Sequence, residues 1–174
     1  MCEIFGEYMM KTLIIIGIII LTSFIGCSNS VSPEDENIIY FNSFETVADF
    51  ENWNGLNENN WKSEVPPNCG YRSVLISGGC VMPHTKYVFQ KTLLPGNYTI
   101  ECLGKATKNS SGGGVTLKCD NSSVSISIID SVWAYKTSET IFLPQTMSLE
   151  IEVNSGGFIH GGMLIDKLIV RKMN

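Results

Sequence analysis

Between residues 38 and 172 the chain alternates between apolar and polar side chains with a period of two. The alternation is clearest over residues 147–153, where Met, Leu, Ile and Val alternate with Ser and Glu. Successive side chains of a β-strand point to opposite faces, so this pattern predicts strands with one buried and one wet face. The strands predicted in this way are 38–45, 72–77, 86–92, 97–106, 115–120, 124–129, 135–143, 147–153 and 163–172.

The segments between these strands contain Gly and Pro, which are typical of turns. No stretch keeps a 3.6-residue period for long enough to predict a regular helix. Thr46, followed three residues later by Asp49, predicts a single helical turn with a capping box. Many short strands separated by turns are typical of an all-β fold, so we expect an antiparallel β-sandwich, in jelly-roll form, over residues 38–174.

The N-terminal segment has a different pattern. Lys11 precedes an unbroken apolar run over residues 13–21, and Gly26 precedes Cys27. A short basic region, a brief apolar run and a small residue before the cut describe a secretory signal. The run is shorter than the ~20 residues that a membrane-spanning helix needs. The signal starts naturally at the second of two adjacent methionines, so we interpret residues 1–9 as a mis-assigned start.

Residues 24–27, Phe-Ile-Gly-Cys, resemble the lipobox of bacterial lipoproteins, although that family prefers Leu at the first position and a smaller residue at the second. The resemblance implies that residues 1–26 are removed and that Cys27 carries acyl chains such as palmitate. Residues 27–37 then form the lipidated Cys and a flexible, acidic tether. Ser28 after the Cys is similar to lipoproteins of the outer membrane, so we expect a protein anchored there, in the bacterial cell envelope. An ordinary cleaved signal and an uncleaved anchor are the alternatives.

The cysteines after the lipobox predict disulfides. Cys69, Cys80, Cys102 and Cys119 make an even number, which is typical of bridged cysteines in an exported protein. They allow three pairings. We favour Cys102–Cys119, which lie on consecutive predicted strands, and this leaves Cys69–Cys80 by default. The sequence has no Cys-x-x-Cys pair, which argues against a zinc or redox site.

One charged residue breaks the pattern of the last predicted strand. In a regular strand Asp166 shares a face with Leu164, Leu168 and Val170, which makes it a carboxylate among core side chains. A buried, unpaired charge is costly, so Asp166 must be neutralised, paired or metal-bound. A hard oxygen ligand in an exported protein points to structural Ca²⁺, with Glu45 as a second ligand if the terminal strands are neighbours. The alternative is an Asp166 that accepts backbone N–H bonds or pairs with a lysine.

Three segments resemble galactose-binding-like carbohydrate-binding modules. Phe44-Glu45, with Trp53 shortly after, is similar to the opening of those modules. Residues 87–106 are similar to their central block of Gln, Leu, Pro-Gly-x-Tyr and Lys-Ala, and residues 162–170 resemble their final strand. The resemblance implies a β-sandwich and carbohydrate as a partner. It also implies calcium, because the Asp of the family's final strand often helps to bind a structural calcium ion.

Sugar rings have a flat apolar face and hydroxyl groups at their edges, so a binding site needs exposed aromatic side chains beside polar ones. Each candidate taken alone is equally consistent with a packing residue. If the candidates gather at one end of the sandwich, they form a platform for glycan. The candidates, which lie in or beside predicted loops, are Trp61, Tyr71, Arg72, His84, Tyr87, Trp133 and Tyr135.

The sequence carries no catalytic motif such as Gly-x-Ser-x-Gly or His-Glu-x-x-His. Glu150 and Glu152 lie two residues apart on the wet face of one predicted strand, whereas a glycosidase needs two carboxylates across a cleft. A net charge of −5 without a basic patch argues against nucleic acid. We therefore expect a non-catalytic, lipid-anchored, glycan-binding protein. The alternative is a structural or protein-binding lipoprotein of the cell envelope that uses the same fold without binding sugar.

Overall fold

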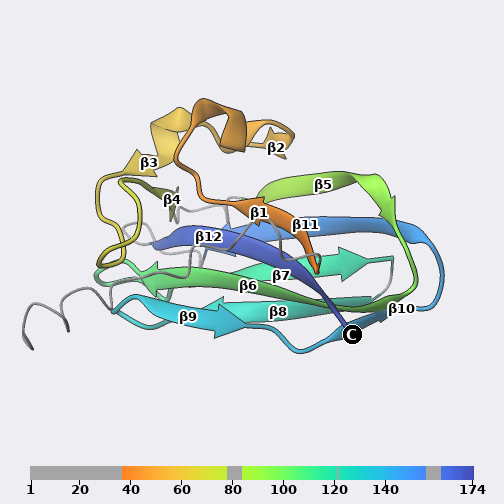
Figure 1. Ribbon diagram of the computed structural model, residues 1–174. Helices are drawn as coiled ribbons and strands as arrows, with labels where there is room; N and C mark the ends of the chain where they lie inside the picture. Colours follow the sequence, from red (N-terminus) through yellow and green to blue (C-terminus); the bar gives the residue numbers. More distant parts are fainter. Residues whose placement is uncertain (1–36, 78–83, 121, 156–161) are drawn as a thin grey trace, which may run out of the picture. The chain divides into compact units, whose positions relative to one another are not determined.

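The structure, a computed structural model, describes residues 37–77, 84–120, 122–155 and 162–174 (Figure 1). The chain divides into two compact units, and the sandwich described below is the unit formed by Pro33–Pro66 and Gly70–Asn174. The predicted signal peptide, Cys27 and the tether up to residue 36 lie outside the described residues. In the part of the chain that is described, no helix has the length and apolar character that crossing a bilayer requires.

Almost all of the described elements are strands, as the alternating pattern predicts. The helical turn predicted at Thr46 is present as a 3₁₀ helix, and the Thr46 N–H donates to the Asp49 carboxylate at 2.9 Å. The elements in chain order are β1 (Ile38–Asn42), η1 (Val47–Phe50), β2 (Trp53–Asn54), η2 (Glu58–Asn60), β3 (Trp61–Lys62), β4 (Ser73–Ser77), β5 (His84–Leu93), β6 (Gly96–Ala106), β7 (Gly113–Cys119), β8 (Ser122–Ile128), β9 (Ala134–Thr137), β10 (Ile141–Leu143), β11 (Met147–Ser155) and β12 (Gly162–Met173).

The single strand predicted over residues 135–143 is two strands, β9 and β10. Ser138, which separates them, bonds to Ile100 with both its backbone and its side chain. The Ser138 N–H donates to the Ile100 carbonyl at 2.9 Å, and the Ser138 hydroxyl accepts the Ile100 N–H at 3.1 Å. The serine hydroxyl thus takes the place of a backbone carbonyl, and the regular ladder stops at this residue.

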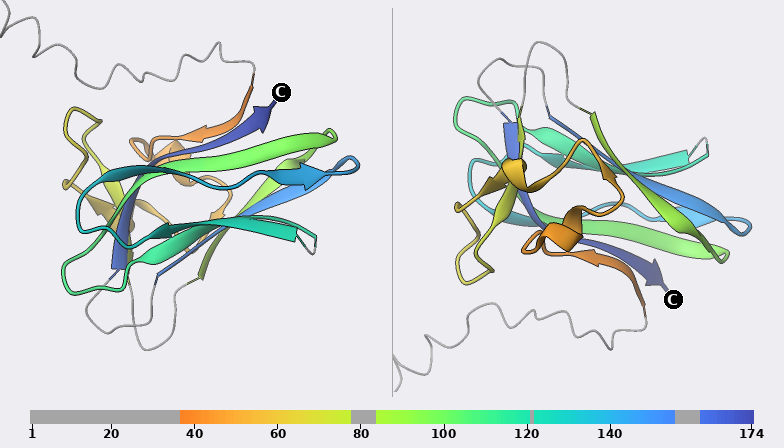
Figure 2. Two further views of the ribbon diagram at one scale, coloured as in Figure 1. Left: turned by 90° about the horizontal axis from the view of Figure 1, so that it is seen from below. Right: turned by 90° about the horizontal axis from the view of Figure 1, so that it is seen from above.

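Two antiparallel sheets face each other in this unit (Figures 1 and 2). The seven-stranded sheet runs β10-β6-β12-β4-β3, with β1 beside β12 and β9 beside β6. The five-stranded sheet runs β2-β5-β11-β7-β8. Every strand pair is antiparallel. This arrangement confirms the predicted fold class, an antiparallel β-sandwich, and it places the first and last strands side by side.

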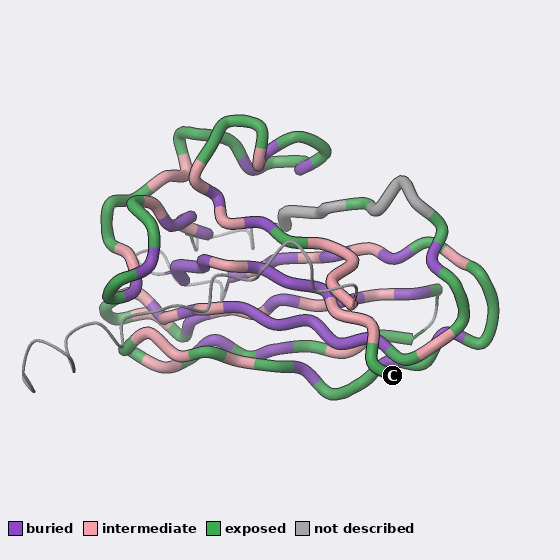
Figure 3. The backbone as a smooth tube through the Cα atoms, viewed as in Figure 1, coloured by how far each residue is buried: buried purple, intermediate pink, exposed green. Residues whose placement is uncertain are grey.

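The core lies between the sheets and is built from the alternating apolar residues of each strand (Figure 3). On β11 of the five-stranded sheet, Leu149, Ile151 and Val153 are fully buried, and the residues between them are polar. On the seven-stranded sheet, Ile100 and Val170 are equally buried. Burying one aliphatic side chain contributes roughly 1.5–3 kcal/mol, so the alternation determines which face of each strand turns inward.

A bulge in β12 changes the face that Asp166 occupies. The β12–β6 register shifts between Asp166 and Ile169, and Lys167 has a φ of +46°. Before the bulge the odd-numbered residues of β12 belong to the core, and after it the even-numbered residues do. Asp166 therefore shares the outer face of the sheet with Leu164. The prediction that Asp166 faces the core is wrong, because a regular two-residue period cannot anticipate an inserted residue.

The predicted disulfide between Cys102 and Cys119 is also wrong, since both are free, buried thiols. Cys102 lies on β6 and Cys119 on β7, which belong to different sheets. The prediction assumed that consecutive strands pair with each other, and strand pairing does not bring these two thiols together. Burial raises the pKa of the Cys102 thiol to about 12. Cys69, in the other unit, is disulfide-bonded, and its predicted partner Cys80 lies outside the described residues.

Candidate functional site

Asp166 and Glu45, the two predicted metal ligands, interact electrostatically in the structure. Asp166 is only 1% exposed. Its Oδ1 accepts the backbone N–H of Lys167 at 2.7 Å, and its Oδ2 is buried with no hydrogen-bond partner among the described residues. Burial raises the pKa of Asp166 to about 6, and the charge of Glu45 raises it further against the opposing effect of Lys167. At neutral pH this site therefore holds an ionised carboxylate with too few partners.

Glu45 anchors the segment that leads into β4. Its Oε1 accepts the backbone N–H of Tyr71 at 2.9 Å and that of Arg72 at 3.3 Å. Gly70 makes this approach possible, because a Cβ built at that position would lie 1.9 Å from Glu45 Oε1, and its φ is +56°. Both hydrogen bonds fall on Oε1, so Oε2 can serve another ligand.

Trp61, a predicted sugar-stacking residue, is packed against its neighbours. Its indole N–H donates to the Phe44 carbonyl at 2.7 Å, and its ring meets Phe50 edge-on at 5.4 Å between centroids. The Arg72 guanidinium lies 3.8 Å from the centre of the Trp61 ring and covers one face. Tyr71, by contrast, is 86% exposed. The predicted residues at 61, 71 and 72 thus gather at one place, where the tryptophan supports the loop.

The residues around Asp166 fit a calcium ion in their chemistry. Ca²⁺ takes roughly six to eight oxygen ligands, and carboxylates and backbone carbonyls supply them in proteins. Within the described ranges no three residues of the types His, Cys, Asp and Glu gather as a metal site. Glu45 and Asp166 would therefore hold the ion together with carbonyl groups and water. The buried, partnerless Oδ2 of Asp166 is the observation that favours this fit, because a cation would satisfy it.

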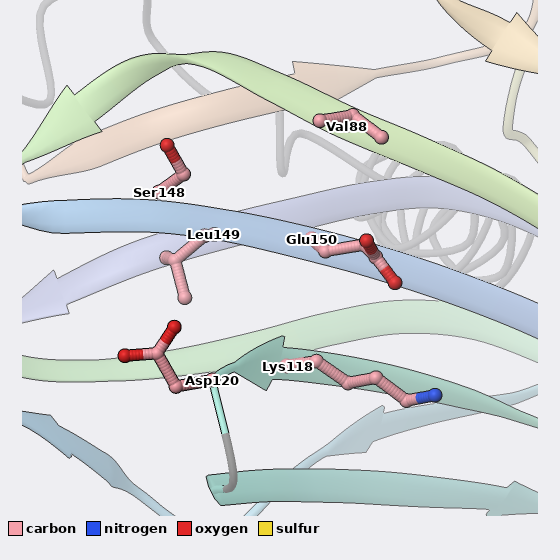
Figure 4. A pocket seen from close by; sticks show the side chains of 6 residues that line it. All are labelled: Val88, Lys118, Asp120, Ser148, Leu149 and Glu150. Carbon is pink, nitrogen blue, oxygen red and sulfur yellow. The ribbon is translucent and has the colours of Figure 1, made fainter.

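A second site lies on the open face of the five-stranded sheet, the face opposite the core. Its pocket has a volume of about 310 Å³. Figure 4 shows that the lining residues come from β5, β11 and β7, which lie side by side, and from the turn that directly follows β7. The lining residues are Val88, Lys118, Asp120, Ser148, Leu149 and Glu150.

Strand register brings the charged groups of this pocket together. Glu150 lies directly opposite Val88 on one side and Lys118 on the other. The Lys118 ammonium forms an ion pair with Glu152, two residues along the same strand as Glu150. Sequence reasoning treated both glutamates as ordinary surface residues. The alternating pattern shows only that Glu150 and Glu152 face solvent. It cannot show the pocket, because the residues beside them come from β5 and β7, which are distant from β11 in the sequence.

Tyr135 lies away from the Trp61 cluster. It belongs to β9, and β6, β12 and β4 separate β9 from β3, which carries Trp61. The Tyr135 hydroxyl donates to the Glu101 carboxylate, which also accepts Arg171 Nε at 3.2 Å. Burial is the main cause that raises the pKa of Tyr135, and Glu101 adds to it. Trp133, just before β9, is half-buried.

His84 and Tyr87 belong to the other sheet. They lie on β5, opposite Asn154 and Ile151 of β11, and their side chains lie outside the described residues. The predicted aromatic residues thus do not form a single platform, because they are divided between the two sheets.

No protein-family model and no curated protein matches the sequence. Solved structures match the fold. The CBM22-1–GH10 modules of Clostridium thermocellum xylanase 10B, complexed with xylohexaose, align with 80% of this chain and 29% of that chain, at 11% identity and a TM-score of 0.53. The enzymatically active domain of tailspike protein 4 from bacteriophage CBA120 aligns with 75% of this chain and 20% of that chain, at 12% identity and a TM-score of 0.54.

A carbohydrate-binding module, TmCBM61 in complex with β-1,4-galactotriose, aligns with 71% of this chain and 90% of that chain, at 17% identity and a TM-score of 0.48. The chain spans less than a third of the length of the xylanase modules and of the tailspike domain. At these identities the likeness to the xylanase modules and to the tailspike domain establishes a shared β-sandwich fold and nothing more.

Proposed function

We propose that this chain is a lipid-anchored, non-catalytic protein of the bacterial cell envelope that binds glycan on the open face of its five-stranded sheet. The observation that carries the proposal is the polar pocket on that face. Its volume of about 310 Å³ lies at the lower end of the roughly 300–1,000 Å³ that is usual for small-ligand sites. The sandwich fold shared with the CBM22-containing xylanase modules supports the proposal.

The chemistry of the pocket suits a hydroxylated ligand. The carboxylates of Asp120 and Glu150 can accept hydrogen bonds from sugar hydroxyls, and the Lys118 ammonium can donate to sugar oxygens. Val88, which is 45% exposed, offers an apolar contact for the C–H face of a sugar ring. The described lining residues include no aromatic side chain, so we expect hydrogen bonds to supply most of the specificity.

The polar surface continues from the pocket toward the edge of the sheet. Thr116 on β7 and Ser125 on β8 share a hydrogen bond of 2.9 Å between their hydroxyls. Ser123 and Ser127 are exposed on the same face of β8. Neighbouring strands lie about 4.8 Å apart, so a glycan lying across them would meet further polar groups on each successive strand.

We propose that the glycan is bound and not cleaved. A glycosidase places two carboxylates on either side of the scissile bond. Asp120 and Glu150 both line the pocket, so any binding test must also search for hydrolysis products. Intact oligosaccharide after prolonged incubation is the expected result.

We further propose that Glu45 and Asp166 hold a structural Ca²⁺. When bound, the ion would supply the positive charge that this pair of carboxylates needs. Its expected role is to stabilise the segment that Glu45 ties to β4. The ion would not take part in glycan binding, because Glu45 and Asp166 belong to the seven-stranded sheet side of the fold and the pocket lies on the other sheet.

The lipid anchor at Cys27 is a separate part of the proposal, and it rests on the lipobox-like sequence. Cys27→Ser removes the thiol that would be acylated. The variant should move from the membrane fraction to the soluble fraction and lose metabolic labelling with palmitate. Unchanged fractionation and labelling would contradict the anchor without affecting the glycan proposal.

The glycan proposal is tested with the full-length protein purified in detergent. Xylohexaose, the ligand of the xylanase modules, is the first oligosaccharide to titrate, followed by an array of plant, host and microbial glycans. Binding of one glycan class supports the proposal. Silence across the array, with correctly folded protein, contradicts it.

A further inference from the structure

The outer strand of the five-stranded sheet, β8, has a free edge. It pairs with β7 over its whole length, from Gly113 opposite Ile128 to Cys119 opposite Ser122, without a register shift. Among the described strands, no other strand of that sheet lies beyond β8 (Figure 1). The opposite edge strand, β2, is only two residues long. β2 covers only two residues of β5, but the register between β5 and β11 shifts, so among the described strands of this sheet β8 is the long edge without an irregularity.

This edge lacks the devices by which proteins usually protect such a strand. Lysines, prolines, bulges and very short strands normally prevent an edge from pairing with another chain. The sequence of β8, SSVSISI, contains no charged residue and no proline. Its pairing with β7 contains no bulge. Its outward backbone groups are therefore a template for a further strand.

The segment after β8 carries two exposed apolar side chains. Ile129 is 66% exposed and Val132 is 68% exposed. A partner strand that pairs with β8 would meet Ile129 first, because it directly follows the strand.

We propose that a second copy of this chain pairs with β8, strand against strand and antiparallel, about a twofold axis at Ser125. Residues 123–127 read Ser-Val-Ser-Ile-Ser, so their polar and apolar positions are the same in both directions. On this axis Val124 of one copy lies opposite Ile126 of the other, and serines lie opposite serines. A self-complementary strand is what an isologous twofold interface requires.

Charge is consistent with this pairing. The chain has a net charge of −5, but the edge itself is neutral, so the strands meet without direct repulsion. The axis at Ser125 brings Asp120 of one copy toward Asp130 of the other. Asp130 forms an ion pair with Lys136, which offsets its charge.

The dimer does not depend on glycan binding, but it has a consequence for it. Pairing two β8 strands joins two five-stranded sheets into one continuous sheet. The serine-bearing open faces of the two copies then lie next to each other. A glycan long enough to cross the axis could contact both copies.

Cysteine cross-linking of the full-length protein tests the proposal. In the dimer the two Ser125 residues lie opposite each other, with Cα atoms about 4.5–5.5 Å apart, within the range of a disulfide. Ser125→Cys under mild oxidation should give a dimer on a non-reducing gel. Thr116→Cys is the matched control, because it occupies the neighbouring position on β7 and lies about 14 Å from its counterpart across the axis.

A second variant tests the same edge without a cross-link. Ser125→Lys places two positive charges on the axis, where they repel each other. Light scattering should show that this variant dimerises only at a protein concentration at least tenfold higher than the unmodified chain needs. The proposal is overturned if the unmodified protein is monomeric at all concentrations, or if Ser125→Cys cross-links no better than Thr116→Cys. Exclusive cross-linking of Ser125→Cys to a different protein also overturns it. The two proposals fail separately: unmodified protein that is monomeric but binds glycan contradicts the dimer alone, and unmodified protein that is dimeric but binds no glycan contradicts the glycan site alone.

Discussion

Glu45 and Arg72 bond to each other twice across 27 residues of sequence. The Glu45 carboxylate accepts the Arg72 backbone N–H at 3.3 Å, and Arg72 Nη1 donates to the Glu45 carbonyl at 3.2 Å. The same guanidinium covers the ring of Trp61. These contacts fix the segment before β4 against the loop that follows β1, and they assign Trp61 a role in stability.

Trp61→Ala should therefore destabilise the protein without abolishing glycan binding. The substitution removes a ring packed against Phe50 and Arg72, and loss of a large aromatic side chain typically costs about 3–5 kcal/mol. We expect about half of this loss in stability, because Trp61 is only partly buried. Urea unfolding measures the loss, and glycan titration is done below the unfolding transition. A stable Trp61→Ala variant that no longer binds glycan would show that the ring stacks on sugar.

Calcium should stabilise the folded chain through Asp166. An ion present at about 100 times its Kd contributes roughly 2.7 kcal/mol, which corresponds to an increase in Tm of roughly 5–10 °C. A chelator should therefore lower the Tm of the unmodified protein by several degrees. Asp166→Asn should melt at the same temperature with and without chelator.

Glu139→Gln is the control for the calcium experiment, because it removes an exposed carboxylate from the loop between β9 and β10. It should keep the full response to chelator. If the Tm of the unmodified protein is the same with and without chelator, the calcium proposal is contradicted.

Without metal, Asp166 should make stability depend on pH. Its pKa in the folded chain is raised to about 6, above the ordinary value of 3.8. The folded state therefore holds the proton more tightly, so this contribution to stability is complete below about pH 4 and is lost as the pH rises through about 6. The free energy of unfolding should fall by up to about 3 kcal/mol over that window. Metal-free protein, unfolded in urea at several pH values, provides the measurement. An identical pH dependence in Asp166→Asn would argue against this assignment.

The alternation of side chains was sufficient to predict the strands, because burial of every second residue is a local property. The same reasoning predicted that Asp166 is buried but placed it on the wrong face, since one inserted residue at Lys167 reverses the pattern. The pocket around Lys118 and Glu150 was missed. It depends on which strands become neighbours, and alternation carries no information about that. The Cys102–Cys119 prediction failed for the same reason.

The free thiols among the described residues, Cys102 and Cys119, should be inert in the folded protein. Cys102 is fully buried and its pKa is raised to about 12, and burial also raises the pKa of Cys119. The thiolate is the reactive form, so a maleimide should label neither residue at neutral pH and both in denaturant. Mass spectrometry of labelled peptides measures each site. A disulfide between these two cysteines, or rapid labelling of Cys102, would contradict the packing of the core.

Calorimetric titration of glycan into the Glu150→Gln variant tests the central proposal most directly. Glu139→Gln is the matched control, since it makes the same chemical change in the loop between β9 and β10, two strands of the other sheet. With the glycan identified on the array, Glu150→Gln should bind at least tenfold more weakly while melting within a few degrees of the unmodified protein, and Glu139→Gln should bind normally. Unchanged affinity in Glu150→Gln would show that the open face of the five-stranded sheet is not the glycan site.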